Sequence, residues 1–132
     1  MAGKETSRFI VVPQRIREEA YHNIAQVEKE VGPLWKYMDS GMVPESDVTV
    51  FVRKVERDVS ADLDVGPSMH KHEVNQLYCL VGEVKVEVTL GADKHVVKGP
   101  ATILIPAGMN HTLKFAGGRG YLVNVFSGAS YR

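Results

Sequence analysis

The first third of the chain carries a helical pattern of hydrophobic positions. Between residues 14 and 31, apolar residues recur at steps of three or four: Ile16, Ala20, Ile24, Val27 and Val31. This period places them on one face of a helix, so the pattern predicts an amphipathic helix over about 14–31 that ends at Gly32-Pro33. Leu34, Trp35 and Met38 favour one or two further helical turns.

From Val48 onward the helical period gives way to short strands between turns. Pairs containing Gly or Pro mark the turns, among them Gly66-Pro67, Gly91-Ala92 and Gly99-Pro100. The segments between them are predicted strands: Val48–Val55, Glu73–Val81, Val84–Leu90, Lys94–Val97, Ala101–Pro106, His111–Phe115 and Gly120–Phe126. Their regular spacing predicts an all-β sandwich or barrel. Within Val84–Leu90, apolar and polar residues alternate strictly, which indicates one buried and one solvated face.

These two patterns predict a two-part chain. Residues 1–47 form a strand and helical extension that packs on the barrel, and residues 48–132 form the β-barrel domain. The apolar stripe of the helix must be buried on its own barrel or on a second subunit, and we expect a homodimer. The apolar run Phe9–Val12 would be an exposed edge unless it pairs with a strand of its own or a neighbouring barrel.

Composition excludes several classes of partner. The 132 residues suit one domain, and sixteen basic residues balance sixteen acidic ones. Zero net charge argues against binding to nucleic acid or an anionic membrane. No apolar run approaches the roughly 20 residues of a membrane helix, and we predict no signal peptide. Because Cys79 is the single cysteine, no intrachain disulfide can form, which favours the cytoplasm.

The strongest chemical signal is a cluster of histidines at spaced positions. His70 and His72 are separated by one residue, so on a strand both rings would project from the same face and could converge on one ion. Gln76 lies four residues past His72 and returns to that face. His111 follows Pro106-Ala107-Gly108, a rigid turn at the start of a strand. Glu73 directly follows His72, so it should face away from this group.

The order and spacing of these residues resemble the two signature motifs of the cupin superfamily. The matching positions are Gly66, His70, His72, Gln76 and Gly82, followed by Gly99, Pro106, Gly108 and His111. The resemblance covers about Val48 to Phe126, and it implies a double-stranded β-helix. The N-terminal α-helical segment that the hydrophobic period predicts lies outside the resemblance. It also implies one divalent metal held by His70, His72, Gln76 and His111. Imidazole and amide ligands are compatible with Zn, Fe, Mn and Ni, so the identity of the ion stays open.

Gln76 departs from the cupin pattern, in which a Glu usually stands at this position. Three neutral imidazoles and a neutral amide leave the charge of the ion uncompensated, which makes it a stronger Lewis acid. The resemblance therefore implies a metal-dependent enzyme of the lyase, isomerase or cyclase type that acts on a small oxygenated substrate. Two alternatives stay open, an iron-dependent dioxygenase and a non-catalytic cupin that binds a metal or ligand.

Three further residues are candidates for substrate chemistry. Tyr78 shares the face of Gln76, so it could donate a proton or hydrogen bond to a bound substrate, or it could simply fill the barrel. Arg53 and Phe51 share a face opposite Val48, Val50 and Val52, and Arg53 could bind a substrate carboxylate. The alternative for Arg53 is a surface cation.

Overall fold

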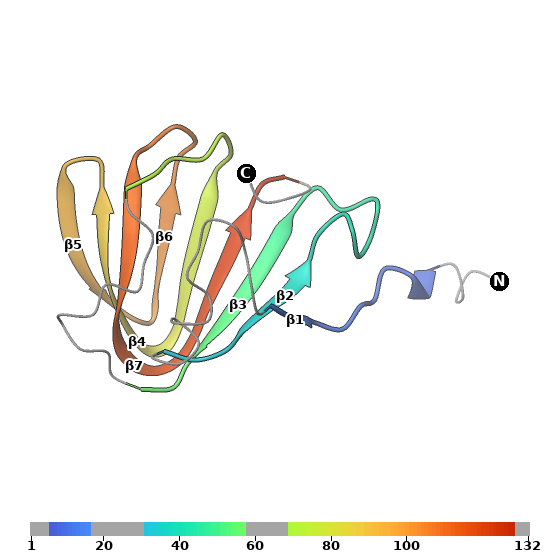
Figure 1. The fold of residues 1–132 in the computed structure, drawn as a ribbon, viewed down its shortest axis with the longest axis horizontal. Coiled ribbons are helices and arrows are strands. Elements are labelled where there is room, and N and C mark those ends of the chain that lie inside the picture. Colours follow the sequence, from blue (N-terminus) through green and yellow to red (C-terminus); the bar gives the residue numbers. More distant parts are fainter. Residues whose placement is uncertain (1–5, 17–30, 58–68, 129–132) are drawn as a thin grey trace.

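The computed structural model describes residues 6–16, 31–57 and 69–128, and these contain seven strands in one hydrogen-bonded system (Figure 1). The strand order is β1-β2-β3-β7-β4-β5, and β6 pairs with β4. The strands are β1 (Gln14–Ile16), β2 (Leu34–Met38), β3 (Thr49–Val55), β4 (Gln76–Leu90), β5 (Asp93–Lys98), β6 (Ala101–Ile105) and β7 (His111–Phe126).

The two long strands β4 and β7 build both layers of the molecule. They pair antiparallel along their whole length, and both curve at the lower end of the view in Figure 1. On one side of this bend, the first part of β4 pairs with β6 and the last part of β7 pairs with β3. On the other side, the second part of β4 pairs with β5. The predicted strands on either side of Gly82 and of Gly117-Gly118 are therefore single bent strands, and the all-β prediction is confirmed.

Glycine is required where β4 and β7 bend. Gly118 has a φ of +103°, and a Cβ atom built on it would collide with the carbonyl oxygen of Glu83 on the paired strand. Because this contact would involve the backbone of Glu83, no side chain can move aside to relieve it. The close approach of the two bent strands therefore depends on this residue.

Replacing Gly118 with Ala should lower the free energy of unfolding by about 2–4 kcal/mol, because positive φ and backbone overlap add to each other. Gly91→Ala is the matched control, since Gly91 also has a positive φ but open space around its Cβ position. That control should lose only about 1 kcal/mol. Urea unfolding followed by circular dichroism measures both values, and equal losses would contradict the proposed role of close backbone contact.

The core lies between the two layers and follows the alternation seen in the sequence. Val84, Val86 and Val88 are buried, whereas Lys85 on the opposite face is exposed, as predicted. They pack with Leu80 of the same strand and with residues of β3, β6 and β7: Val55, Ile103, Ile105, Leu113 and Leu122. On the outer face of the layer that contains β3, the side chains are also apolar and half-buried: Val50, Val52, Leu77, Cys79, Val123 and Val125.

The predicted N-terminal helix is wrong at both of its described ends. Gln14–Ile16 is a strand that pairs with β2, and Leu34–Met38 is a strand that pairs with β3. The physical reason is tertiary pairing: the edge of β3 offers unsatisfied backbone groups, and hydrogen bonds to them outweigh a weak helical period. Residues 17–30, which carry most of the predicted helix, lie outside the described residues.

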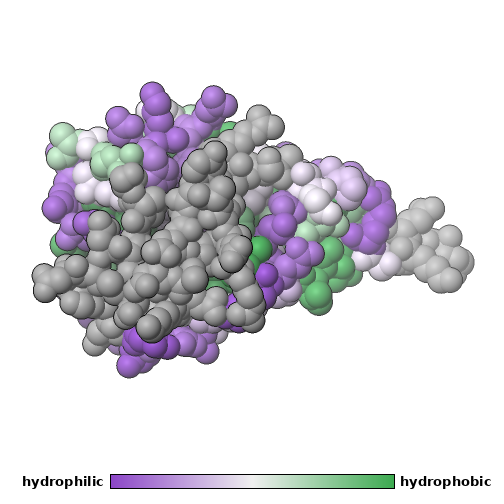
Figure 2. Space-filling view, viewed as in Figure 1, coloured by the Kyte–Doolittle hydropathy of each residue, from purple (hydrophilic) through white to green (hydrophobic). Residues whose placement is uncertain are grey.

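The apolar run Phe9–Val12 is not part of a strand, and three of its four residues are exposed to solvent, whereas Val11 is half-buried. Ile10 is 81% exposed and Val12 is 79% exposed, and Figure 2 shows hydrophobic residues on the surface near this end of the described chain. The homodimer that would cover this run stays a prediction. None of the described residues belongs to a helix with the length and hydropathy that a bilayer crossing requires.

Candidate metal centre

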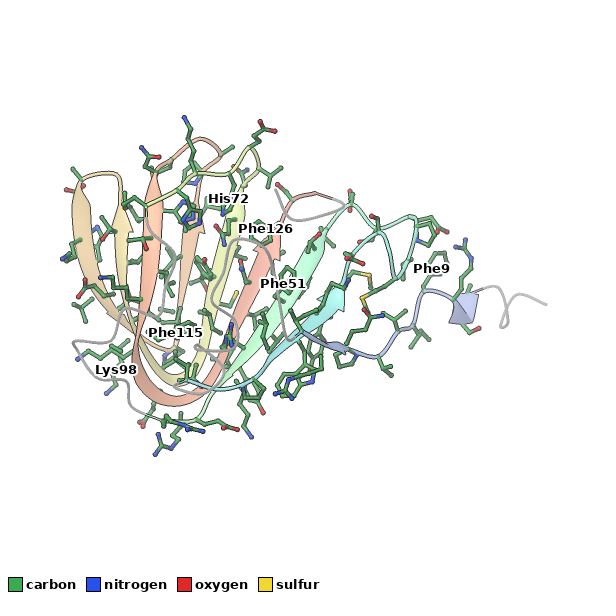
Figure 3. All side chains as sticks on the ribbon, viewed as in Figure 1. Phe9, Phe51, His72, Lys98, Phe115 and Phe126 are labelled. Atoms are coloured by element: carbon green, nitrogen blue, oxygen red, sulfur yellow. The ribbon has the colours of Figure 1, made fainter. Side chains whose placement is uncertain are left out.

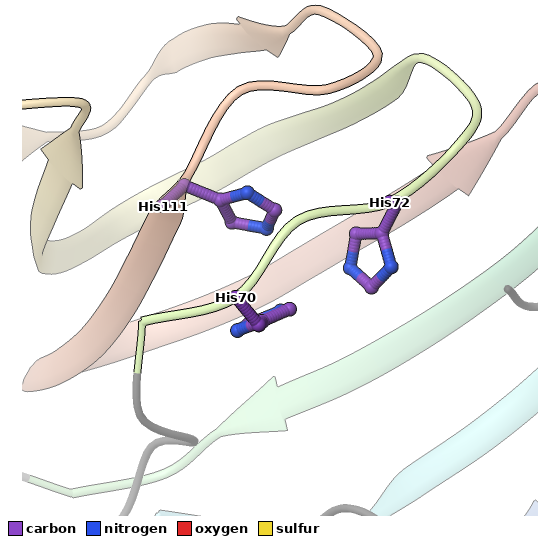
Figure 4. A group of neighbouring side chains, drawn as sticks. All are labelled: His70, His72 and His111. Atoms are coloured by element: carbon purple, nitrogen blue, oxygen red, sulfur yellow. The ribbon is translucent and has the colours of Figure 1, made fainter.

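Three histidine rings converge at one end of the interior (Figure 4). One ligand nitrogen from each of His70, His72 and His111 lies within 4.8 Å of the other two. Their ring centroids are 4.4–5.1 Å apart. His72 and His111 are buried and His70 is half-buried. Metal–imidazole bonds are about 2.0–2.1 Å long, so the three rings need only small rotations for their nitrogen atoms to reach a single ion.

The backbone fixes the positions of these histidines. His70 and His111 exchange two hydrogen bonds, of 3.0 Å from the N–H of His70 and 2.7 Å from the N–H of His111. The N–H of Gly108 donates to the carbonyl oxygen of His72 at 2.8 Å, so the predicted turn after Pro106 holds the second histidine. The predicted strand Glu73–Val81 begins only at Gln76, and His72 therefore lies in a loop rather than on a regular strand.

His111 is prepared to act as a ligand through its Nε2 atom. Its Nδ1 lies 3.0 Å from the carbonyl oxygen of Met109, which requires a proton on Nδ1 and leaves the Nε2 lone pair free. Burial, together with the nearby His70, lowers the pKa of His111 below its ordinary value, although the Met109 carbonyl opposes this. The ring is therefore neutral at neutral pH. Nε2 is buried and has no hydrogen-bond partner among the described residues.

Gln76 supplies a second buried polar atom without a partner. The residue is 1% exposed at the start of β4, and its Nε2 donates to Oδ1 of Asn124 at 2.9 Å. Its Oε1 is buried and accepts no hydrogen bond from the described residues. Gln76 pairs across the sheet with Phe126, whose ring contacts His72. An unsatisfied buried acceptor costs about 1–3 kcal/mol, so these two atoms fit a site that a cation completes.

The donor set contains neutral groups only. Within the described residues, the cluster of potential ligands consists of the three histidines without any Asp, Glu or Cys. Glu73 is exposed, as the sequence predicted, and His95 on β5 is exposed as well. His22 lies outside the described residues. A divalent ion at this position would therefore keep its full charge.

Tyr78 lies two residues after Gln76 on the same inner face and belongs to the hydrophobic core. Burial raises the pKa of its phenol well above the ordinary value, although the neighbouring Gln76 amide opposes this. The phenol therefore stays protonated and can donate a hydrogen bond but cannot serve as a base near neutral pH. Its catalytic role stays a prediction.

Aromatic side chains line the interior next to the histidines. The ring of Phe126 packs edge-on against His72 with centroids 5.4 Å apart, and Phe51 packs edge-on against Phe126 at 6.5 Å. Figure 3 shows Phe126 and Phe51 following His72 along the interior. Phe51 thus lies one aromatic ring removed from the histidines, where it shapes an apolar wall. Contact between Phe51 and a substrate stays a prediction.

Arg53 is buried, so the alternative that it is a surface cation is wrong. It is 7% exposed, its Nη1 donates to the carbonyl oxygen of Gly32 at 2.8 Å, and its guanidinium lies 6.0 Å from the centre of the Phe115 ring. On β3 it is four residues beyond Thr49, which pairs with Phe126, a separation of about 13 Å along the strand. Arg53 therefore lies at a different level of the barrel from the histidines, and substrate binding by it stays a prediction.

Sequence reasoning missed Asn124, the partner of Gln76, and the position of Phe126 beside His72. The signal for Asn124 is present in the chain. In the predicted strand Gly120–Phe126, Asn124 alternates with Leu122 and Phe126, so a polar side chain stands on an otherwise apolar inner face. Asn124 is half-buried, and polar side chains on such a face are generally hydrogen-bonded, which marks them as candidates for a specific role.

Comparison with known sequences and structures gives a clear result for the fold. No family model and no curated protein matches the sequence. Among solved structures, an RmlC-like cupin from Shewanella frigidimarina superposes with a TM-score of 0.55 at 14% identity, covering 74% of this chain and 76% of that one. KdgF from Halomonas sp. gives a TM-score of 0.58 at 15% identity, covering 86% and 96%.

Oxalate decarboxylase from Bacillus subtilis, a protein with Mn(II) centres, is also similar. Its TM-score is 0.61 at 11% identity, and the match covers 91% of this chain but only 28% of that one. At these identities the likeness is one of fold. The chain has the cupin fold, with a three-histidine cluster at one end of its interior.

Proposed function

We propose that the protein is a metal-dependent enzyme that uses one divalent ion as a Lewis acid on a small oxygenated substrate. His70, His72 and His111 would hold the ion, and Gln76 would contribute Oε1 as a fourth ligand. Lyase, isomerase or cyclase chemistry is the reaction class that we favour, because these reactions require charge stabilisation and proton transfer but no net redox change.

The observation that carries this proposal is the neutral, convergent donor set. The convergence of three imidazoles supports a bound cation, and so does the buried amide oxygen of Gln76, which has no partner among the described residues. With no carboxylate in the cluster, a bound divalent ion would polarise a substrate carbonyl or lower the pKa of a substrate hydroxyl. Mn(II) in the structurally similar oxalate decarboxylase is compatible with this, although that protein is much longer.

The remaining residues have roles that follow from their positions. Phe126 and Phe51 exclude water from one side of the cluster, which strengthens electrostatic interactions inside it. Tyr78, held protonated by burial, would donate a hydrogen bond to a substrate oxygen that gains negative charge. Substrate discrimination would then depend on how polar groups of the substrate meet these few polar side chains.

Metal analysis of the purified protein, followed by a screen of small hydroxy and keto acids, tests the proposal. We expect about one divalent ion per chain and turnover without oxygen consumption. Oxygen uptake by the iron-loaded protein would instead support the dioxygenase alternative. Stoichiometric metal without turnover of any acid would favour a binding cupin.

Replacing Gln76 with Glu should alter catalysis more than fold. The two side chains are nearly isosteric, but the carboxylate would cancel part of the charge of the ion. We expect turnover at saturating metal to fall about tenfold or more, which corresponds to about 1.4 kcal/mol of transition-state stabilisation. Thermal unfolding should shift by only a few degrees. Unchanged turnover would show that the reaction does not depend on the charge of the ion.

A further inference from the structure

The side-chain amide of Gln76 has two ends in different surroundings. Its nitrogen donates to Oδ1 of Asn124 at 2.9 Å, whereas its oxygen is buried without a partner among the described residues. Only the oxygen can ligate a cation, because the amide nitrogen has no available lone pair. Whichever group binds the nitrogen therefore decides whether Gln76 can serve as a ligand.

The backbone of Asn124 lies in the middle of the sheet. Its backbone pairs with Phe51 on β3 and with Tyr78 on β4, so strands flank it on both sides. Its neighbours on the inner face, Leu122 and Phe126, are both buried in the core. A side chain on a paired strand starts from a fixed backbone, so it can orient a contacting amide at a lower entropic cost than a side chain on a loop.

We propose that Asn124 is the positioning residue of the metal centre. By accepting the N–H of Gln76, it turns Oε1 of Gln76 away from itself and makes that oxygen available as a ligand. The contact uses an N–H that Gln76 has and that a glutamate at this position would lack. This inference rests on the proposed metal site and adds the residue that orients its fourth ligand.

Two substitutions of similar size separate this role from simple packing. Asn124→Asp retains an oxygen that can accept the Gln76 hydrogen bond, whereas Asn124→Leu removes it. Affinity for Co²⁺ is measured by competition with a chromophoric chelator, and the visible spectrum of the Co²⁺-loaded protein reports the ligand set. We expect Asn124→Leu to bind Co²⁺ about 10- to 100-fold more weakly with an altered spectrum. Asn124→Asp should retain the wild-type spectrum and bind at least as tightly.

A double-mutant cycle shows whether Asn124 acts through Gln76. In a Gln76→Ala background, Asn124→Leu should change Co²⁺ affinity less than twofold, because the group that it orients is already absent. If the losses of the two single variants multiply in the double variant, Asn124 has only a structural role and the inference is wrong. Should Asn124→Leu fail to fold by circular dichroism, Asn124→Ala, which only removes atoms, takes its place.

The experiment distinguishes the inference from the proposed function. If wild-type protein binds Co²⁺ and Asn124→Leu binds it with the same affinity and spectrum, the metal site stands and the role of Asn124 is rejected. If the wild-type protein does not bind Co²⁺ stoichiometrically, both the metal site and the positioning role are rejected.

Discussion

Substituting His111 with alanine should reduce divalent-metal affinity at least about 100-fold, because losing a ligand costs more than losing the group that orients one. His70→Ala should have the same effect. The ligand atoms of the three rings lie within 4.8 Å of one another. No other described histidine belongs to this group, so none can replace a missing ligand. Competition with a chelator measures the affinity, and elemental analysis measures the stoichiometry.

His95→Ala is the matched control for these variants. His95 lies on β5 with an exposed side chain, so its removal should leave both metal content and stability unchanged. Circular dichroism establishes that each variant is folded. A folded His111→Ala protein that still binds one ion with wild-type affinity would show that the histidine cluster is not the metal site.

The strand pattern could be predicted from sequence because local chemistry determines it. Alternation in Val84–Leu90 places valines inward at every second position, and Gly or Pro pairs interrupt the strands where turns occur. The bends of β4 and β7 were predicted as breaks between strands, since a glycine ends a local pattern whether the chain turns back or only curves. Which of the two happens depends on the partner strand, which is distant in the sequence.

The N-terminal prediction failed for a related reason. Apolar residues between 14 and 31 match a helical period, yet Gln14–Ile16 is a strand of three residues, too short to show any period. Leu34–Met38 pairs with β3 through backbone groups, and backbone hydrogen bonding leaves little trace in side-chain pattern. Local sequence therefore could not reveal that these segments extend the sheet.

The prediction of the metal ligands assumes that two of the histidines lie on one regular strand, and this assumption does not hold. His70 and His72 were expected to share the face of one strand, but His72 lies in a loop held by the N–H of Gly108. The three histidines converge nevertheless, because the bridge between His70 and His111 joins the two motifs. The burial of Arg53 could not be predicted, because its acceptor, Gly32, lies 21 residues away at the predicted end of the helix.

Deleting residues 1–42 should prevent stable folding, because these residues supply part of the barrel. The deletion removes β1, β2 and Val31, whose side chain is fully buried in the core. It also removes the carbonyl oxygen of Val31, which accepts from the N–H of Glu56, and that of Pro33, which accepts from the N–H of Lys54, both at 2.9 Å. The carbonyl oxygen of Gly32, which accepts from the Arg53 side chain inside the barrel, is lost as well. Together these losses exceed about 5 kcal/mol, comparable to the whole stability of a small domain.

Deleting residues 1–12 alone is the matched control, and it separates folding from assembly. This shorter deletion removes the exposed run Phe9–Val12 but none of the seven strands, and the Arg8–Glu45 ion pair that it breaks is exposed. The free energy of unfolding should therefore change by no more than about 1 kcal/mol.

Urea unfolding compares both deletions with the full chain, and light scattering reports their mass. If the 1–42 deletion unfolds with the midpoint of the full chain, β1 and β2 are dispensable to the barrel. If the 1–12 deletion stays folded but becomes monomeric while the full chain is dimeric, the exposed run forms the predicted homodimer interface.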